Sequence, residues 1–300
     1  MKYRRLGKTE LEVSVVGIGT WQFGGEWGKD FSQDEADRIL GRAAELGINL
    51  VDTAECYGDH LSEEFVGEAI RRDRDRWIVA TKFGHAYDGH LKRQQLWSPE
   101  AVRKQLDRSL WALQTDRIDL YQFHSGSDDV FDNDELWTML DGQVAAGKVR
   151  FLGISIRSGV DPMHQARLAS QVGASALQVI YNRLDRGPEE HVFPASIEQD
   201  LGVLARVPLA SGFLSGKYRP GTVFTAPGDV RSTFSPQRTE EMLQEVEEIQ
   251  RSEVPAGVPM AAWALAWCLQ HPAVTCVIPG CKSVEQVELN ASAADLDFVP

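Results

Sequence analysis

Short apolar runs and helix-like amphipathic segments alternate along the chain from residue 14 onward. Each apolar run is short enough to be a strand, and the segment after it shows helical periodicity. Eight strands are predicted, namely Ser14–Thr20, Asn49–Ala54, Trp77–Phe83, Ile118–His124, Val149–Ser155, Ala176–Asn182, Val203–Leu209 and Val274–Pro279. This repeat predicts the α/β class and a single (β/α)8 TIM barrel over residues 1–300, since such a barrel needs about 250 residues.

The predicted helices begin with typical capping sequences. Ser32–Leu46 opens with Ser32 and carries Glu35 three positions later, and Ser98–Leu113 opens with Ser98 before a proline. The other predicted helices are Leu61–Arg71, Asp134–Ala146, Pro162–Val172, Phe193–Asp200, Thr239–Gln250, Met260–Gln270 and Ser283–Ala293.

Two segments lie outside this repeat. An N-terminal β-hairpin is predicted, with strands Tyr3–Leu6 and Leu11–Val13. A long polar loop, roughly Ser211–Arg238, follows the seventh strand and contains many Gly and Pro residues. A loop of this length inside a compact domain is usually functional or mobile.

An open, doubly wound sheet is the alternative fold. Such a sheet usually carries a glycine-rich dinucleotide fingerprint after its first strand. Here the first strand ends in the sequence from Gly17 to Gln22, which has no third glycine at the required spacing. The barrel is therefore favoured.

Composition excludes several classes of partner. The net charge of −13 argues against nucleic acid, because phosphate backbones require a basic surface. The residues from Met1 to Arg5 do not resemble a signal peptide, and no apolar run is long enough to span a membrane, so we expect a cytoplasmic protein. The four cysteines show no metal-binding spacing, so no metal site is predicted. Cys56 is expected to be a small buried residue rather than a redox-sensitive thiol.

Four polar residues end or follow three consecutive predicted strands. Asp52, Lys82 and His124 lie at strand ends, and Tyr57 lies in the loop after Asp52. In an α/β barrel these ends meet on one face. A phenol has a pKa near 10, and a nearby ammonium such as Lys82 is expected to lower it. Each residue alone has an ordinary structural explanation, but together they predict a site that protonates a carbonyl oxygen.

Aromatic residues divide into two predicted groups. Trp21, which follows the first strand, is the best candidate for the substrate pocket, with Phe23, Trp27 and Trp97 as further candidates. Such a wall suits an apolar or aromatic carbonyl compound. Tryptophans on predicted helices are expected in the core, namely Trp111, Trp137, Trp263 and Trp267.

The chain resembles the aldo-keto reductase family over nearly its whole length. The segments that carry the resemblance are Gly17–Trp21, Asp52–Gly58, Lys82, His124, Leu152–Ser155, Gln178–Asn182, Leu214–Lys217 and Ile278–Asn290. The resemblance implies reduction of aldehydes or ketones with NADPH, or less often NADH. It also implies that Tyr57 is the general acid, that Asp52 and Lys82 tune it, and that His124 orients the substrate. Trp21, Tyr57 and His124 are the implied substrate contacts.

The resemblance also implies a cofactor site. Ser155 and Gln178 match residues that hold the nicotinamide carboxamide. The loop over the pyrophosphate matches Gly212, Leu214, Gly216 and Lys217, and the adenosine end matches Gly280, Lys282, Gln286 and Asn290. Further implied cofactor positions are Gly19, Thr20, Trp21, Asp52, Arg206, Pro208 and Leu209.

General barrel geometry also predicts a phosphate site after strands seven and eight. Lys282 and Ser283 open the last predicted helix, where a cation and free N–H groups favour a ribose 2′-phosphate. The alternative is that Lys282 is an ordinary solvated lysine.

Two positions depart from the family pattern. Ile156 stands where many relatives have asparagine, and Arg206 stands at or near the place of an aromatic residue that stacks on the nicotinamide. The Arg206 guanidinium could stack on a π face, pair with a phosphate or form a plain salt bridge at the barrel end.

Two other functions fit the same fold. A slow-turnover, NADPH-binding regulatory subunit would need a basic or apolar docking surface. A sugar isomerase or aldolase would need a metal-binding carboxylate cluster or a phosphosugar site. The sequence shows neither feature plainly, so the expected partner is a small carbonyl substrate, and the expected state is a monomer or weak homo-oligomer.

Overall fold

Eight parallel strands form one curved sheet in the computed structural model, which describes residues 1–157 and 163–296. In spatial order they are β3 (Ile18–Gly19), β4 (Leu50–Asp52), β5 (Ile78–Phe83), β8 (Ile118–His124), β9 (Val149–Ser155), β10 (Ala174–Ile180), β11 (Gly202–Arg206) and β12 (Cys276–Val277). Parallel bridges join Val16 to Val277 and Gly19 to Gly280, so the two edges meet. The predicted (β/α)8 barrel is confirmed.

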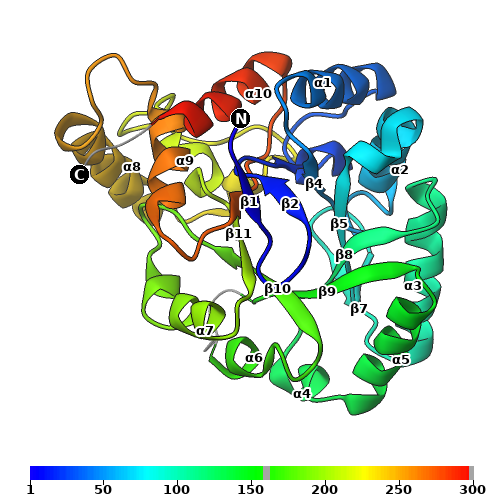
Figure 1. Ribbon diagram of the computed structural model, residues 1–300. Helices are drawn as coiled ribbons and strands as arrows, with labels where there is room; N and C mark the ends of the chain where they lie inside the picture. The colour runs from blue at the N-terminus through cyan, green and yellow to red at the C-terminus, as the bar shows by residue number, and fades with distance from the viewer. Residues whose placement is uncertain (158–162, 297–300) are drawn as a thin grey trace.

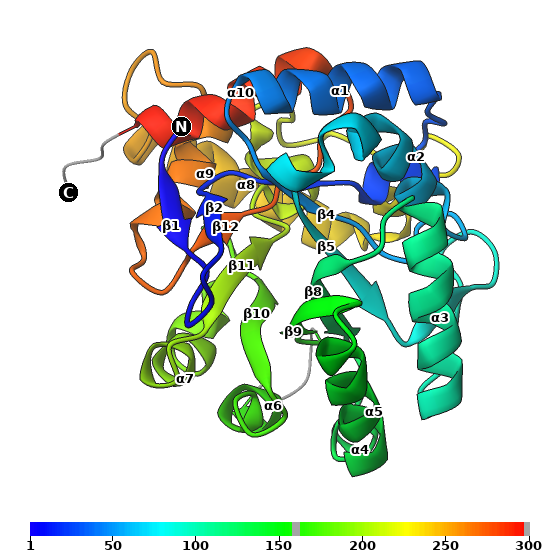
Figure 2. The same cartoon turned by 45° about the vertical axis from the view of Figure 1, so that its right-hand side comes forward.

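The helices surround the strands (Figures 1 and 2). They are α1 (Gln33–Glu45), α2 (Leu61–Ile70), α3 (Pro99–Ala112), α4 (Asp128–Phe131), α5 (Asp134–Ala145), α6 (Met163–Leu168), α7 (Val192–Glu198), α8 (Pro236–Ser252), α9 (Met260–Gln270) and α10 (Val284–Ala291). Short 3₁₀ helices are η1 (Trp21–Gly24), η2 (Arg71–Arg76), η3 (Gly187–Glu189), η4 (Ala210–Ser215), η5 (Val230–Thr233) and η6 (Ser292–Asp295). None of the described helices is long and apolar enough to cross a membrane.

The capping predictions explain where two helices begin. Ser32 Oγ accepts a hydrogen bond from the Glu35 amide, and the Glu35 carboxylate accepts one from the Ser32 amide. Ser98 caps α3 ahead of Pro99, and its Oγ accepts a hydrogen bond from the Ala101 amide. The predicted helix Pro162–Val172 is observed as α6, and its first predicted residue lies outside the described residues.

The predicted N-terminal hairpin closes one end of the barrel. Strands β1 (Tyr3–Arg5) and β2 (Glu12–Ser14) pair antiparallel and lie across the strands in Figure 1. Its apolar side chains pack with residues near the strand starts in one cluster that includes Leu6, Leu11, Val13, Leu50, Ile78, Leu120 and Leu204. Gly7 has a φ of +54°, and a Cβ there would lie 2.1 Å from the Gly202 nitrogen, so this turn sits directly against β11.

A second hairpin was not predicted. Strands β6 (His85–Tyr87) and β7 (Arg93–Gln95) follow β5 and pair antiparallel. Their sequence is polar and only partly buried, so it lacks the apolar alternation that indicates a strand. The hairpin extends the C-terminal end of the barrel and carries His85 and Arg93 toward the candidate site.

The predicted long loop is held over the same end. It contains η4 and η5 and ends where α8 begins, at Pro236. The Gly28 amide donates to the Gly228 carbonyl at 3.1 Å, and Trp27 bridges Asp229. The loop therefore folds back onto the segment after the first strand.

The tryptophan predictions are only partly correct. Trp137 and Trp263 are buried and Trp267 is half-buried, but Trp111 is 76% exposed. Trp111 lies on the outward face of α3, whose buried positions include Leu106, Ser109 and Ala112. The position of a residue around its helix, not its apolar character, decides whether it is buried.

Candidate active site

The four predicted catalytic residues converge at the open end of the barrel. Lys82 Nζ donates to Asp52 Oδ1 at 2.6 Å and to the Thr53 carbonyl at 2.7 Å. The same ammonium lies 3.4 Å from the Tyr57 hydroxyl. His124 faces Tyr57 edge-on, with ring centroids 6.2 Å apart. Asp52, Tyr57 and His124 line the cavity described below, and Lys82 is buried behind them.

Two amides hold the other oxygen of Asp52. Gln122 Nε2 donates to Asp52 Oδ2 at 3.0 Å, and Gln178 Nε2 donates to it at 2.7 Å. The sequence analysis did not identify Gln122, although it precedes His124 by two positions on β8 and therefore shares its side of the strand. With these donors and Lys82, the buried carboxylate is fully partnered.

The pKa of Tyr57 shifts in the direction opposite to the prediction. Burial raises the pKa of Tyr57 to about 12, and the lowering influence of Lys82 is too small to cancel it. The expectation of a lowered pKa is therefore wrong, because it considered charge without desolvation. For Lys82, burial alone would lower the pKa, but the charges of Asp52 and Tyr57 and the hydrogen bonds to both residues together outweigh burial and raise it. At neutral pH both groups keep their protons.

His124 is held as a neutral imidazole. Burial, followed by the charge of Lys82, lowers the pKa of His124 well below its usual value. Its Nδ1 atom lies 3.8 Å from Cys56 Sγ and 3.9 Å from Glu55 Oε1. A neutral imidazole has one N–H group, which can donate a hydrogen bond to a ligand oxygen.

The buried carboxylate of Glu26 links Trp21 to the β6–β7 hairpin through hydrogen bonds. Glu26 accepts hydrogen bonds from the Trp21 indole at 2.6 Å, from the Leu91 amide at 2.8 Å and from Arg93. Burial alone would raise the pKa of Glu26, but these donors outweigh burial and lower it. Neither Glu26 nor Arg93 directly follows a predicted strand, so the sequence pattern does not indicate either residue.

The cavity has a volume of about 690 Å³ and extends from Tyr57 to the segment after β12. Trp21 and Trp27 line it as predicted, whereas Phe23 packs in the core and Trp97 packs on Phe123 behind the wall. Predicted cofactor residues on the wall are Gly19, Thr20, Trp21, Asp52, Gln178, Arg206, Pro208, Leu209, Gly212, Lys217, Gly280, Lys282, Gln286 and Asn290.

Three predicted cofactor residues do not line the cavity. Ser155 is buried and donates to Gln178 Oε1 at 3.4 Å, so it can position Gln178. Leu214 packs in the core, and Gly216 ends η4 in a left-handed conformation. Any cofactor contact of Leu214 would therefore involve its main chain.

The far end of the cavity carries three cationic side chains. Lys217, Arg231 and Lys282 all line it. Arg231 pairs with Asp229 and donates to the Tyr218 hydroxyl at 2.8 Å. Burial, followed by the charge of Arg231, lowers the pKa of Lys282. Clustered cations of this kind fit the phosphates of a nicotinamide dinucleotide.

An unpartnered amide supports the same fit. Asn290 Nδ2 is buried on the cavity wall, and no residue in the described part of the chain forms a hydrogen bond with it. Buried donors are nearly always satisfied, so this atom has room for a polar ligand group. The sequence analysis did not identify Arg231, because it lies within the long loop.

Arg206 does not form a plain salt bridge. Its Nη2 donates to the Ile156 carbonyl at 3.0 Å, its Nε has no partner, and within residues 1–157 and 163–296 no carboxylate pairs with it. Burial lowers the pKa of Arg206, and the side chain lies on the cavity wall. Stacking on a cofactor ring and pairing with a phosphate remain the two alternatives.

A barrel with a phenol beside the buried Lys82–Asp52 pair and a cavity that ends in cations fits the class of oxidoreductases that act with a nicotinamide cofactor. The model of the Aldo/keto reductase family matches residues 15–300, and the chain belongs to that family.

Relatives agree with this assignment. The chain is 33% identical to an uncharacterized oxidoreductase, YqkF of Bacillus subtilis, covering 98% of this chain and 92% of the relative. It is 28% identical to the NADH-specific methylglyoxal reductase of Escherichia coli, covering 99% and 95%. Among solved structures, holo aldo-keto reductase AKR11C1 from Bacillus halodurans has a TM-score of 0.83 at 32% identity, covering 100% of this chain and 93% of that chain. The glycerol dehydrogenase AKR11B4 from Gluconobacter oxydans has a TM-score of 0.85 at 29% identity, covering 99% and 91%.

Proposed function

We propose that the protein is an NADPH-dependent reductase of aldehydes or ketones, with Tyr57 as the general acid. The observation that carries the proposal is the Tyr57 hydroxyl, which faces a cavity and lies 3.4 Å from an ammonium fixed by Asp52. A nicotinamide bound in the cavity would supply the hydride for the carbonyl carbon.

The residues of the chain have separate tasks in this mechanism. Tyr57 gives its proton to the carbonyl oxygen as negative charge develops there, because an alkoxide is a stronger base than a phenolate. Lys82 stabilises the phenolate that remains, and Asp52 keeps Lys82 in place. The neutral imidazole of His124 donates a hydrogen bond that orients the carbonyl oxygen. In alcohol oxidation the same proton moves in the opposite direction.

The preference for NADPH is proposed from the cationic end of the cavity. Lys217 and Lys282 offer positive charge to the extra phosphate, and the Arg231 guanidinium, which is paired with Asp229, lines the same end. Lys282 also stands one residue before the helix cap Ser283. One relative is named an NADH-specific enzyme, so cofactor choice must be tested on this chain itself.

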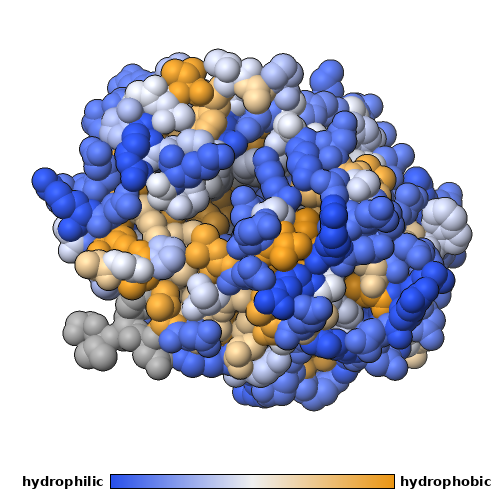
Figure 3. All heavy atoms as spheres, turned by 90° about the horizontal axis from the view of Figure 1, so that it is seen from above, coloured by the Kyte–Doolittle hydropathy of each residue, from blue (hydrophilic) through white to orange (hydrophobic). Residues whose placement is uncertain are grey.

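No observation favours the regulatory-subunit alternative. Large exposed apolar side chains in the described part of the chain come from separate segments, namely Tyr3, Trp111, Ile197 and Val223. On the face shown in Figure 3, hydrophilic residues predominate and hydrophobic residues form separate patches. A small carbonyl compound is the partner we propose, for a cytoplasmic monomer or weak homo-oligomer.

The test is cofactor oxidation measured against a panel of aldehydes, ketones and sugars. We expect wild-type protein to oxidise NADPH with at least one carbonyl substrate, and Tyr57→Phe to lose this activity while still binding NADPH. Binding of NADPH without turnover of any substrate would instead support a regulatory subunit.

A further inference from the structure

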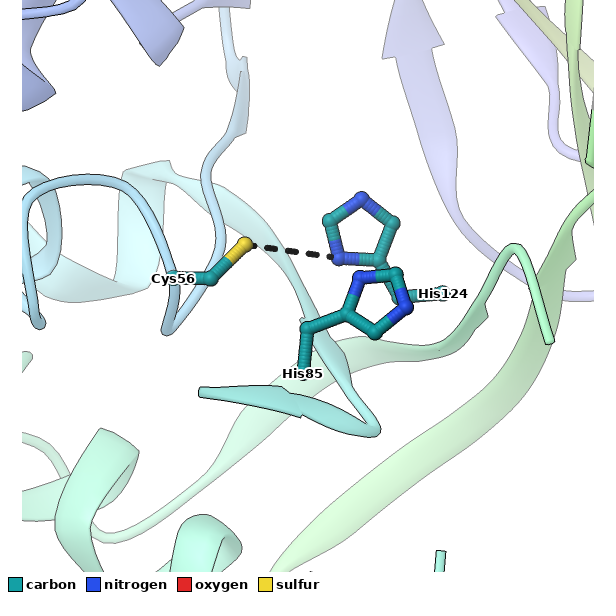
Figure 4. Close-up of side chains that lie close together, drawn as sticks. All are labelled: Cys56, His85 and His124. Carbon is teal, nitrogen blue, oxygen red and sulfur yellow. Dashed lines mark hydrogen bonds between the residues drawn. The ribbon is translucent and has the colours of Figure 1, made fainter. Parts of the chain in front are cut away.

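Three potential metal ligands meet beside the candidate catalytic residues. Cys56 lies in the loop after β4, His85 opens β6 and His124 ends β8. One ligand atom from each lies within 4.8 Å of the others, and Cys56 Sγ is 3.8 Å from His124 Nδ1. Figure 4 shows the thiol and both rings directed toward one another. All three residues line the cavity.

This ligand set suits a soft divalent cation. Zinc binds thiolate at about 2.3 Å and imidazole at about 2.0 Å, which places S and N ligands about 3.5 Å apart in a tetrahedron. The 3.8 Å between Cys56 Sγ and His124 Nδ1 is already close to that spacing. Three protein ligands leave a fourth position, which water from the cavity can fill.

We propose that Cys56, His85 and His124 form a binding site for one Zn²⁺-like cation, and that the bound cation blocks the carbonyl end of the cavity. Coordination replaces the thiol proton of Cys56 with the metal, and the proton passes to solvent. The metal takes the lone pair of His124 Nδ1, so the ring keeps its proton on Nε2. The cation and its water ligand then occupy the space that a carbonyl group needs, because all three ligand residues line the cavity. The cation is thus an inhibitor that competes with substrate, and no redox step is involved.

Nearby charges limit the affinity of this site. The guanidinium of Arg93 interacts with the Cys56 thiol, and the Lys82 ammonium acts electrostatically on the His124 ring. Both positive charges repel a dication. We therefore expect binding that is reversible by a chelator and weaker than at a structural zinc site.

Spectroscopy with Co²⁺ tests the site without any assay of activity. Co²⁺ is the probe because a cobalt–thiolate bond gives a charge-transfer absorption band that Zn²⁺ does not give. We expect one equivalent of Co²⁺ to produce this band in the wild type, and Zn²⁺ to displace it. Cys56→Ala should abolish the band. His85→Phe, which keeps a ring against Trp97 and His124, should weaken Co²⁺ binding at least about tenfold.

The matched control is Cys268→Ala. Cys268 is also a buried free thiol, but it lies on α9 and belongs to no such cluster among residues 1–157 and 163–296. This variant should keep the band unchanged. Persistence of the band in Cys56→Ala, or its absence from folded wild type at millimolar Co²⁺, would overturn the proposal. Cys56→Ser, closer in shape to cysteine, serves if Cys56→Ala fails to fold.

Inhibition by Zn²⁺ is the second readout, and it rests on the proposed function. With an active carbonyl substrate, we expect Zn²⁺ to raise KM while leaving cofactor affinity unchanged. His85→Phe should require at least about tenfold more Zn²⁺ for half-inhibition, relative to its own uninhibited rate. A cobalt band without any carbonyl turnover would keep the metal site and reject the reductase. Carbonyl turnover without a cobalt band would keep the reductase and reject the metal site.

Discussion

The two ends of the barrel are made from opposite kinds of side chain. At the end where the strands start, Leu6, Leu11 and Val13 of the hairpin pack into an apolar plug. At the end where the strands finish, Asp52 and Lys82 form a buried ion pair beside a cavity. Stability and chemistry thus lie at different ends of the barrel, so substitutions at one end should affect one property and leave the other nearly unchanged.

Lys82 serves both chemistry and stability, so its substitution should have the largest effect. Lys82→Met should abolish carbonyl reduction and also lower the free energy of unfolding by about 3–5 kcal/mol, because it leaves the Asp52 carboxylate buried without its cation. Enzyme rates and chemical denaturation measure the two losses. The control is Lys104→Met, whose exposed pair with Glu100 should contribute no more than about 1 kcal/mol. Equal, small losses in both variants would contradict the buried-pair interpretation.

Tyr57→Phe should affect chemistry alone. The ring that packs near Trp21 is kept and only the proton donor is lost, so kcat should fall by roughly 10²–10⁴-fold. Thermal unfolding and cofactor affinity should stay close to wild type. Steady-state rates and melting curves check this prediction, and a variant that retained near wild-type kcat would remove Tyr57 from its assigned role.

Leu6→Ala should lower stability and leave catalysis nearly unchanged. Leu6 is fully buried in the plug, so its truncation should lower the free energy of unfolding by about 2–5 kcal/mol. Below the melting temperature, kcat/KM should change by no more than a few-fold. Val223→Ala, at a site that is 75% exposed, is the control for stability. A large loss of kcat/KM in folded Leu6→Ala protein would show that the two ends are coupled.

Lys282→Ala probes the far end of the cavity. Removing one charge-assisted contact should weaken NADPH binding by roughly tenfold to a hundredfold, about 1.5–3 kcal/mol, with little change for NADH. Fluorescence titration of both cofactors measures the difference, and NADH serves as the internal control. A wild-type protein that binds NADH more tightly would reject the proposed preference.

The smallest effect concerns Glu26. Its hydrogen bonds from Arg93, Trp21 and Leu91 outweigh burial, so its pKa is lower in the folded protein than the usual value of about 4.3. The stabilisation is therefore complete at neutral pH and is lost as the pH falls through the folded-state pKa. Denaturation at pH 7 and pH 4 should show that the stability difference between wild type and Glu26→Gln narrows in acid. A difference that widened in acid would contradict this sign.

Local patterns explain which parts of the fold could be predicted. Strands β8 and β9 begin and end at the predicted residues, because each is a short run in which apolar residues predominate. Strands β3 and β12 are shorter than predicted, because the barrel closes there through isolated bridges rather than a continuous ladder. The β6–β7 hairpin could not be predicted, since its residues are polar and depend on neighbouring segments for their positions.

The barrel and the convergence of Asp52, Lys82 and His124 follow from the order of residues alone, because periodicity and strand-end position are local properties of the chain. The raised pKa of Tyr57 depends on the folded chain, since desolvation depends on what surrounds the phenol. The hydrogen bonds of Glu26 and the cluster of Cys56, His85 and His124 likewise depend on the tertiary structure. Each of these groups joins segments that lie far apart in the chain. Distances between such segments across the closed sheet cannot be read from the sequence.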